Sequence, residues 1–172
     1  MYGNFDKKID ELERKKDRNR IRIKDSEDRD AFQRVFDSRT ISELEKLLNQ
    51  GIIGEIIGIV SQGKEANVYF AYDLDMNPIA LKIYKIDIQS AKWMKNYIRG
   101  DPRFKKIGNS PDKIIYTWCQ KEYKNLKILN KVKIPAPKPL KSKANILVMS
   151  YIGENNGTPA PKLKDSTESI SD

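Results

Sequence analysis

The residues from Gly58 to Lys64 read GIVSQGK and are of the kind that can hold a phosphate group. They match the Walker A pattern, G-x-x-x-x-G-K-[ST], up to its last position, where Glu65 has no hydroxyl to bind Mg²⁺. A Walker loop also has to open a helix, whereas residues 66–72 (ANVYFAY) favour a strand. The segment therefore predicts a glycine loop between two antiparallel strands, either a plain hairpin turn or a flap that covers phosphates.

Lys82 and Glu122 are further candidates for phosphate chemistry. In a strand predicted at 79–84, alternation places Ala80 and Lys82 on one face, which suits a planar ligand lying on Ala80 while the Lys82 ammonium reaches its phosphates. In a helix predicted at 110–130, Glu122 lies at the centre of the apolar stripe. A carboxylate there needs a cation, because breaking a buried ion pair costs roughly 3–5 kcal/mol. Lys82 is the natural partner, as in protein kinases, where such a pair orients the phosphates; the alternative is that both side chains lie separately at the surface.

The sequence contains no histidine and one cysteine, Cys119. The first fact excludes a histidine base, a histidine-containing triad and a histidine-rich metal site. The second excludes an internal disulfide framework and fits a reducing compartment. No apolar run approaches the roughly 20 residues that a membrane-spanning helix needs, and the N-terminus has no secretory signal. We therefore expect a cytoplasmic chain with no membrane partner.

Positive charge is concentrated in one part of the chain. The 172 residues suffice for one domain with tails, and they carry 33 Lys and Arg against 24 Asp and Glu. Residues 82–143 hold 17 of the basic and 4 of the acidic residues. Such a concentration attracts polyanions, whether nucleic acid, ribosomal RNA or nucleotide phosphates. The alternative is a lysine-rich surface that only keeps the chain in solution.

The remaining patterns predict an α+β fold. Residues 1–32 read as a charged extension that is partly helical at most. A short helix is predicted from a capping box at Thr40 and Glu43 to a stop at Gly51. A polar stretch at 87–109 is predicted to be mobile. Strands are predicted at 52–60, 66–72, 79–84 and 144–152. Since short connections join the first three strands, we expect an antiparallel sheet.

Several of these segments together resemble the RIO family of atypical serine/threonine kinases, in particular its first subfamily. An upstream segment, VFDSRTISELEKLLNQGIIGEI, is similar to the entry helix of that subfamily. The other segments that carry the resemblance are SQGKEANVYFA (61–71), ALKIYK (80–85), YIRGDPRF (97–104), WCQKEYKNL (118–126), IPAPKP (134–139) and VMSYIGENNGTPAPKLKD (148–165). The resemblance implies a protein-kinase-like N-lobe at 33–153, with a twisted antiparallel sheet, a glycine-rich hairpin loop, a long αC-type helix and an N-terminal helical extension. Residues 154–172 then form a tail that follows the hinge.

The resemblance also implies ATP with Mg²⁺ as the cofactor and a set of residues that bind it. Lys82, in partnership with Glu122, would hold the phosphates. The resemblance also assigns the phosphate flap to Ser61, Gly63 and Lys64, and the adenine-packing surface to Val68 and Ala80. The gatekeeper position falls to Met149, and the adenine hydrogen bonds fall to the Ser150 carbonyl and the Ile152 amide. Gln62 replaces the usual threonine of the loop, and 87–109 corresponds to a flexible loop of the family.

The chain lacks the family's catalytic loop, which has a His-x-Asp core followed by an asparagine, and its later Asp-x-Gly. We therefore expect no metal ligand here, a C-lobe missing after the hinge, and no activity of this chain alone. A lobe cut at that point is also expected to expose apolar surface and to be weakly stable or to self-associate.

The leading hypothesis is the ATP-binding lobe of a RIO-type kinase or ATPase that, in its full-length form, transfers phosphate to protein serine or threonine during maturation of the small ribosomal subunit. Contact with that subunit and its rRNA would use the basic segment 82–143. The alternative is a non-catalytic basic module that binds RNA or ribosomes, and a Walker-type NTPase is the weakest reading.

Overall fold

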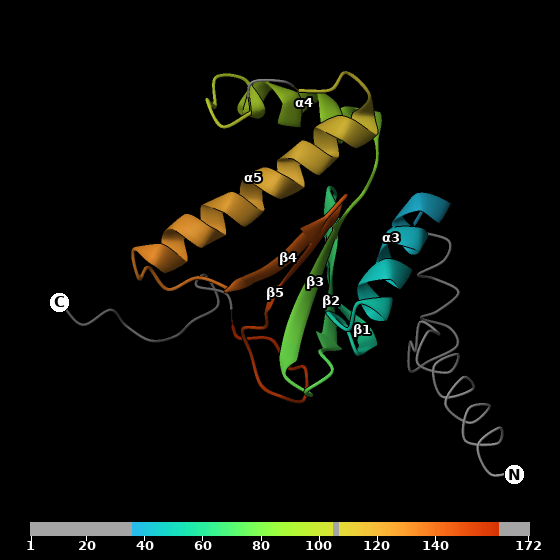
Figure 1. The fold of residues 1–172 in the computed structure, drawn as a ribbon, viewed down its shortest axis with the longest axis vertical. Helices are drawn as coiled ribbons and strands as arrows, with labels where there is room; N and C mark the ends of the chain where they lie inside the picture. Colours follow the sequence, from blue (N-terminus) through green and yellow to red (C-terminus); the bar gives the residue numbers. More distant parts are fainter. Residues whose placement is uncertain (1–35, 105–106, 162–172) are drawn as a thin grey trace, which may run out of the picture.

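The computed structural model describes residues 36–104 and 107–161, so predictions about residues 1–32 and about the end of the tail, 162–172, lie outside the described residues. Within these residues, three helices accompany a five-stranded antiparallel sheet whose strand order is β1-β2-β3-β5-β4 (Figure 1). The elements are α3 (Ser38–Asn49), β1 (Glu55–Gln62), β2 (Ala66–Tyr72), β3 (Pro78–Tyr84), α4 (Ile88–Ile98), α5 (Pro111–Lys131), β4 (Pro139–Lys143) and β5 (Ile146–Ser150).

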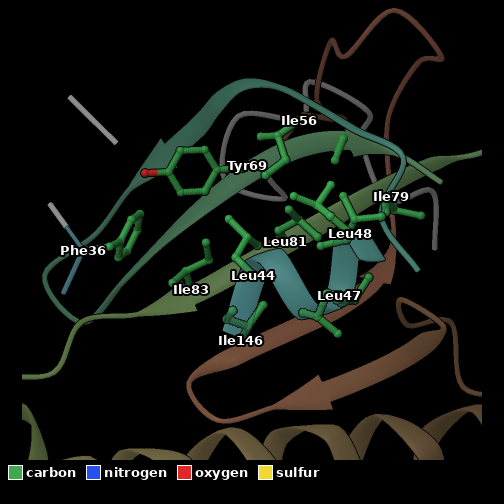
Figure 2. Close-up of a cluster of buried hydrophobic side chains, with 13 residues drawn as sticks. Phe36, Leu44, Leu47, Leu48, Ile56, Tyr69, Ile79, Leu81, Ile83 and Ile146 are labelled. Atoms are coloured by element: carbon green, nitrogen blue, oxygen red, sulfur yellow. The ribbon is translucent and has the colours of Figure 1, made fainter. Parts of the chain in front are cut away.

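One face of the sheet packs against α3. Leu44 and Leu47 of this amphipathic helix are fully buried against side chains that alternate along the strands, such as Leu81 and Ile83 of β3 (Figure 2). Tyr69 of β2 belongs to the same cluster. Since these positions are odd-numbered on β2 and β3, the even-numbered positions, Lys82 among them, must face the other way.

The opposite face of the sheet packs against α5 and, beyond it, α4. In Figure 1, α3 and α5 lie on opposite sides of the sheet. Ile115 and Cys119 of α5 are fully buried in a second apolar cluster that also contains Leu147 of β5 and Met94 of α4. The helix begins at Pro111 after Ser110, as the sequence predicts, and it ends one residue later than predicted. The face that carries Lys82 is therefore the face covered in part by α5.

The predicted capping box at Thr40 is wrong. The helix begins at Ser38, and the Asp37 carboxylate caps it by accepting a 2.8 Å hydrogen bond from the Thr40 backbone N–H. Thr40 is buried and its side chain bonds Asn145 instead. Glu43 forms an ion pair with Lys46 at 2.7 Å. Asp37 is an equally good capping residue, and the tertiary contact of Thr40 decided between them.

The stretch 87–109, predicted to be mobile and polar, contains a helix. Asp87 caps α4 through a 2.7 Å hydrogen bond from the Ser90 backbone N–H. Met94 and Ile98 of this helix are fully buried. The prediction missed the i, i+4 spacing of these two residues because it followed the polar composition of the stretch and the turn residues Gly100, Asp101 and Pro102.

The prediction of a single last strand at 144–152 is also incomplete. The strand within that range, β5, is shorter than predicted, and a further strand, β4, precedes it across a tight turn in which Ala144 adopts a positive φ of 50°. The first predicted strand, 52–60, begins later and becomes β1. Over the described residues, no helix is long and apolar enough to cross a membrane.

Candidate functional site

A strand lysine and a helix glutamate form an ion pair between β3 and α5. The Lys82 Nζ lies 2.8 Å from both Oε1 and Oε2 of Glu122. Each side chain keeps 27% of its surface exposed, so the pair is partly buried and still reachable from solvent. The alternative that both residues lie separately at the surface is therefore excluded.

Local structure explains how each partner reaches the other. On β3, alternation places Lys82 on the face toward α5, because Leu81 and Ile83 fill the α3 side. On α5, Glu122 comes three residues after the buried Cys119 and four before the buried Leu126. Helical spacing turns it toward the sheet together with these apolar residues.

Tyr84 is a third member of this site. Its hydroxyl donates a hydrogen bond to Oε2 of Glu122, and its side chain is buried. Its ring centroid lies 5.1 Å from the Lys82 Nζ, within range of a cation–π contact. Burial raises the pKa of Tyr84 far above its ordinary value, and the adjacent Glu122 carboxylate raises it further. The hydroxyl therefore stays protonated and acts as a donor.

The predicted ligand-facing residues line up on the same face of the sheet. Register pairs Ser61 with Val68, and Val68 with Lys82. One step along, Ala80 is paired with Met149 of β5. Since paired residues of adjacent strands share a face, these five side chains form two neighbouring rows. Ala80 is buried, Val68 and Met149 are half-buried, and Ser61 is exposed.

The glycine loop is a tight hairpin between β1 and β2. The Gly63 N–H donates to the Ala66 carbonyl at 2.9 Å, and the Gly63 carbonyl accepts from Lys85 Nζ at 2.8 Å. A Cβ on Gly63 would lie 2.9 Å from the Ala66 carbonyl oxygen, so the turn needs glycine there. Lys64 lies exposed at the tip. Because a strand follows this loop and no helix does, the Walker reading is wrong.

The predicted adenine-binding residues lie at the end of β5 and just beyond it. Ser150 is the last residue of β5, and Ile152 follows with 54% of its surface exposed. The Ile152 carbonyl accepts a 3.2 Å hydrogen bond from the Ala160 N–H, where the chain folds back on itself. This segment follows directly after Met149 at the end of β5.

Phe70 was not predicted from the sequence, although it lies in the same row as Ala80 and Met149. Its ring is 3% exposed, because it packs edge-on against Tyr151 at 4.7 Å between centroids and because Gly157 lies over it. A Cβ on Gly157 would lie 2.9 Å from the Phe70 ring. Register with Ala80 is the signal that could have found Phe70, whereas its cover comes from a contact between distant segments.

The described residues contain no cluster of side chains that could form a metal-binding site. In residues 36–104 and 107–161, no group of three or more Cys, Asp or Glu side chains lies close enough together to hold a metal ion. Cys119 is buried beside Ser142, with its Sγ 3.4 Å from the Ser142 Oγ. Burial raises the pKa of the Cys119 thiol to about 12, so this cysteine is not a reactive nucleophile.

An antiparallel sheet with a glycine hairpin, a strand lysine and a long helix that supplies the pairing glutamate defines a protein-kinase-like N-lobe of the α+β class. The predicted fold class is therefore confirmed. The model of the family described as the RIO domain matches residues 67–172, so the chain belongs to the RIO domain family. This match also confirms the resemblance found in the sequence.

Relatives with known names have similar sequences. The chain is 41% identical over 163 residues to serine/threonine-protein kinase rio1 of Dictyostelium discoideum, which covers 94% of this chain and 28% of that protein. It is 42% identical over 160 residues to serine/threonine-protein kinase RIO1 of Homo sapiens, covering 92% of this chain and 28% of that protein. It is 37% identical over 152 residues to the RIO-type serine/threonine-protein kinase Rio1 of Haloferax volcanii, covering 86% of this chain and 52% of that protein.

Among solved structures, the Rio2 kinase–ADP/Mg²⁺–phosphoaspartate complex from Chaetomium thermophilum has a TM-score of 0.47 and 17% sequence identity, and it covers 64% of this chain and 31% of that chain. The chain thus spans between about a quarter and a half of the length of the relatives described above.

Proposed function

We propose that this chain is the ATP-binding lobe of a RIO-type serine/threonine kinase or ATPase. The observation that carries the proposal is the Lys82–Glu122 ion pair, with 2.8 Å contacts, on the sheet face that begins at the glycine hairpin. In protein kinases the corresponding pair holds the α and β phosphates. Membership in the RIO domain family supports the same assignment.

The residues of this face fit a nucleotide. Lys82 is the cation, and its ammonium is partly exposed, so phosphate oxygens can reach it. Ala80 and Val68 present small apolar surface in the neighbouring positions, where the adenine ring would lie. Ser61, Gly63 and Lys64 are exposed around the hairpin and would cover the phosphates. Met149 would be the gatekeeper, with the Ser150 carbonyl and the Ile152 amide bonding the adenine edge.

Mg²⁺ does not fit the described residues, because no suitable cluster of ligands lies among them. The named relatives are longer than this chain. We therefore assign the Mg²⁺ ligands and the catalytic base to a C-lobe that those longer proteins would supply, and we assign no phosphoryl transfer to the described residues. With a C-lobe, the expected reaction is transfer of the γ-phosphoryl group to protein serine or threonine, or hydrolysis of ATP.

Thermal unfolding with a non-hydrolysable ATP analogue tests the nucleotide assignment. A ligand at about 100 times its Kd raises the free energy of unfolding by about 2.7 kcal/mol, which should raise the melting temperature of the chain. Lys82→Ala should abolish this increase, measured from the variant's own unliganded melting temperature. Lys141→Ala, an exposed lysine of β4, is the matched control and should keep it. An increase that survives in Lys82→Ala would contradict the assignment.

The cellular role follows from the family resemblance alone and belongs to the same proposal. We place the protein in the cytoplasm, in maturation of the small ribosomal subunit, with the basic segment 82–143 as its rRNA contact. The 17 basic residues of that segment are the feature of this chain that supports such a contact.

A specific surface favours the second candidate, a basic RNA-binding module. Lys113, Lys124, Lys127 and Lys131 follow one side of α5 at helical spacing. Within the described residues, none of the four forms an ion pair with an acidic side chain. A row of unneutralised cations of this kind attracts a phosphate backbone.

Binding of a single-stranded RNA at increasing salt tests the second candidate. Because the first candidate also includes an rRNA contact, the two are separated only when this test is combined with the unfolding test with the ATP analogue. The RNA-binding module predicts an affinity that falls steeply with salt, that the combined Lys124→Ala and Lys127→Ala change weakens, and that an ATP analogue does not alter. Absence of RNA binding at low salt would exclude this second candidate and leave the nucleotide assignment untouched.

A further inference from the structure

Tyr84 contacts both members of the ion pair. It lies two residues after Lys82 on β3, so its side chain points to the same face of the sheet. Its side chain is 2% exposed, and its hydroxyl donates to Oε2 of Glu122. The Lys82 ammonium lies 5.1 Å from the centre of its ring. The carboxylate is therefore held from two sides, by an ammonium and by a phenol.

The two contacts differ in what they can fix. A lysine ammonium is a compact point charge on a flexible stem, so it attracts a carboxylate in many orientations. A tyrosine hydroxyl on a buried ring donates in one direction and from one place. Glu122 retains 27% exposure, so water competes for its oxygens. Of the two contacts, the Tyr84 hydrogen bond is the one that selects a rotamer of Glu122.

Tyr84 is itself fixed by Asn145. The Tyr84 N–H donates to the Asn145 carbonyl at 2.9 Å, and the Tyr84 carbonyl accepts from the Asn145 side-chain amide at 2.7 Å. The same amide donates to the Thr40 hydroxyl at 2.9 Å, and Asn145 is 1% exposed. A continuous set of hydrogen bonds thus runs from α3 through the turn between β4 and β5 to the ion pair on the far side of the sheet.

We propose that Tyr84 is a positioning residue that holds the Glu122 carboxylate in the rotamer that pairs with Lys82. The benefit to nucleotide binding rests on the function proposed above, whereas the effect on the ion pair does not. Loss of the hydroxyl frees Glu122 to turn toward solvent, and the Lys82 ammonium then loses its fixed place over the sheet.

Carbodiimide cross-linking of the whole chain measures directly how often the Lys82 and Glu122 side chains are in contact. The reagent activates a carboxylate, and a lysine amine in contact with it attacks to form an amide with net loss of water. The Lys82–Glu122 cross-link is quantified by mass spectrometry against a Lys121–Asp101 cross-link, since that pair lies 3.0 Å apart between α5 and the loop after α4. The ratio of the two reports on Glu122 separately from the folding of the helix.

Tyr84→Phe should lower this ratio about tenfold, because a hydrogen bond to a charged group is worth about that factor or more in an equilibrium. Tyr97→Phe, which removes an exposed hydroxyl from α4, should leave it unchanged. An unchanged ratio in Tyr84→Phe would overturn the proposal.

If Tyr84→Phe does not fold, the reference cross-link disappears as well, and the proposal is then tested on the wild-type chain by NMR. Its Tyr84 hydroxyl proton should give a slowly exchanging NMR signal that Glu122→Ala abolishes; absence of that signal in the wild-type chain would equally overturn the proposal.

Binding of a non-hydrolysable ATP analogue distinguishes this proposal from the function on which it rests. If the nucleotide assignment and the positioning role both hold, Tyr84→Phe weakens the binding of the analogue, while Tyr97→Phe does not. A lower cross-link ratio in a chain that binds no analogue would contradict the nucleotide assignment and uphold the positioning role. If Tyr84→Phe binds the analogue and its cross-link ratio is unchanged, the nucleotide assignment is upheld and the positioning role is contradicted.

Discussion

At the residue scale, partial exposure determines what the Lys82–Glu122 pair is worth. Fully exposed pairs contribute up to about 1 kcal/mol, and removal of one partner from a buried pair costs roughly 3–5 kcal/mol. With 27% exposure on each side, this pair lies between the two limits. Its charges are sheltered enough to be ordered, yet open enough for a phosphate to approach. A pair that served stability alone would gain nothing from that opening.

Cys119 shows the opposite case, a potentially reactive group that its surroundings silence. Burial raises the pKa of its thiol to about 12, so at pH 8 only about one thiol in ten thousand is ionised. Iodoacetamide should therefore label the native chain very slowly and label the chain in urea at an ordinary rate. Since Cys119 is the sole cysteine, mass spectrometry of the whole chain measures it without ambiguity.

The control for this labelling is Ser142→Ala, which removes the hydroxyl beside the Cys119 sulfur. That variant should stay at least as slow, because burial raises the pKa of the Cys119 thiol, whereas the hydrogen bond to Ser142 lowers it. Rapid labelling of the native wild-type chain would show that α5 opens from the sheet far more often than its packing implies.

At the scale of elements, Asp101 fastens the loop after α4 to α5. Its carboxylate accepts hydrogen bonds from Arg103 and lies 3.0 Å from the Nζ of Lys121 on α5. Arg103 also reaches Asn125, one helical turn further. The hydrogen bonds from Arg103, followed by the one from Lys121, hold the pKa of Asp101 well below its ordinary value.

The lowered pKa of Asp101 makes the stability of this junction depend on pH. Because its pKa is lower in the folded than in the unfolded chain, the stabilisation is complete above the unfolded value of about 4 and disappears as the pH falls toward the folded value. Asp101→Asn should therefore lower the melting temperature at pH 7, and the difference from wild type should shrink below about pH 4. Thermal unfolding at pH 7, 5 and 3 measures it.

Asp75→Asn is the control for this pH series, since Asp75 is an exposed residue of the turn between β2 and β3. It should change the melting temperature little at any of the three pH values. A difference between Asp101→Asn and wild type that stayed constant down to pH 3 would mean that the charge of Asp101 is not what stabilises the junction.

How well the sequence predicts each element depends on where its determinants lie. The strand 66–72 and the helix that begins at Pro111 were predicted well, because alternation, apolar spacing and a proline start are local signals. The strand β4 contains a proline and two lysines, and it exists because β5 pairs with it. Such a strand depends on a neighbour, so no local pattern reveals it.

The same distinction holds within the site. Alternation was enough to place Ala80 and Lys82 on one face, and helical spacing was enough to turn Glu122 toward them. Tyr84 shares the parity of Lys82 and could have been found in the same way. The cover over Phe70, by contrast, requires the chain after β5 to fold back, and local patterns do not report contacts between such distant residues.

At the scale of the whole molecule, one sheet is shared by two apolar cores. Leu81 and Val148 belong to the core beneath α3, whereas Tyr84 and Leu147, on the same strands, belong to the core beneath α5. Neighbouring residues of a strand point to opposite faces, so neither core can lose its order without disturbing the backbone of the other. We therefore expect the two cores to unfold as one cooperative unit.

The positions of the tryptophans allow a direct test of that cooperativity. The chain has 2 tryptophans, and both Trp93 and Trp118 pack in the core beneath α5, so their fluorescence reports on that side alone. Leu44 is fully buried on the α3 side, and Leu44→Ala should cost about 2–5 kcal/mol. If β3 and β5 couple the cores, the tryptophan transition should fall by on the order of 10 °C. Glu45→Ala, at an exposed position of α3, should leave it nearly unchanged. A tryptophan transition that stayed in place in Leu44→Ala, while circular dichroism showed an earlier loss of structure, would mean that α4 and α5 fold on the sheet independently of α3.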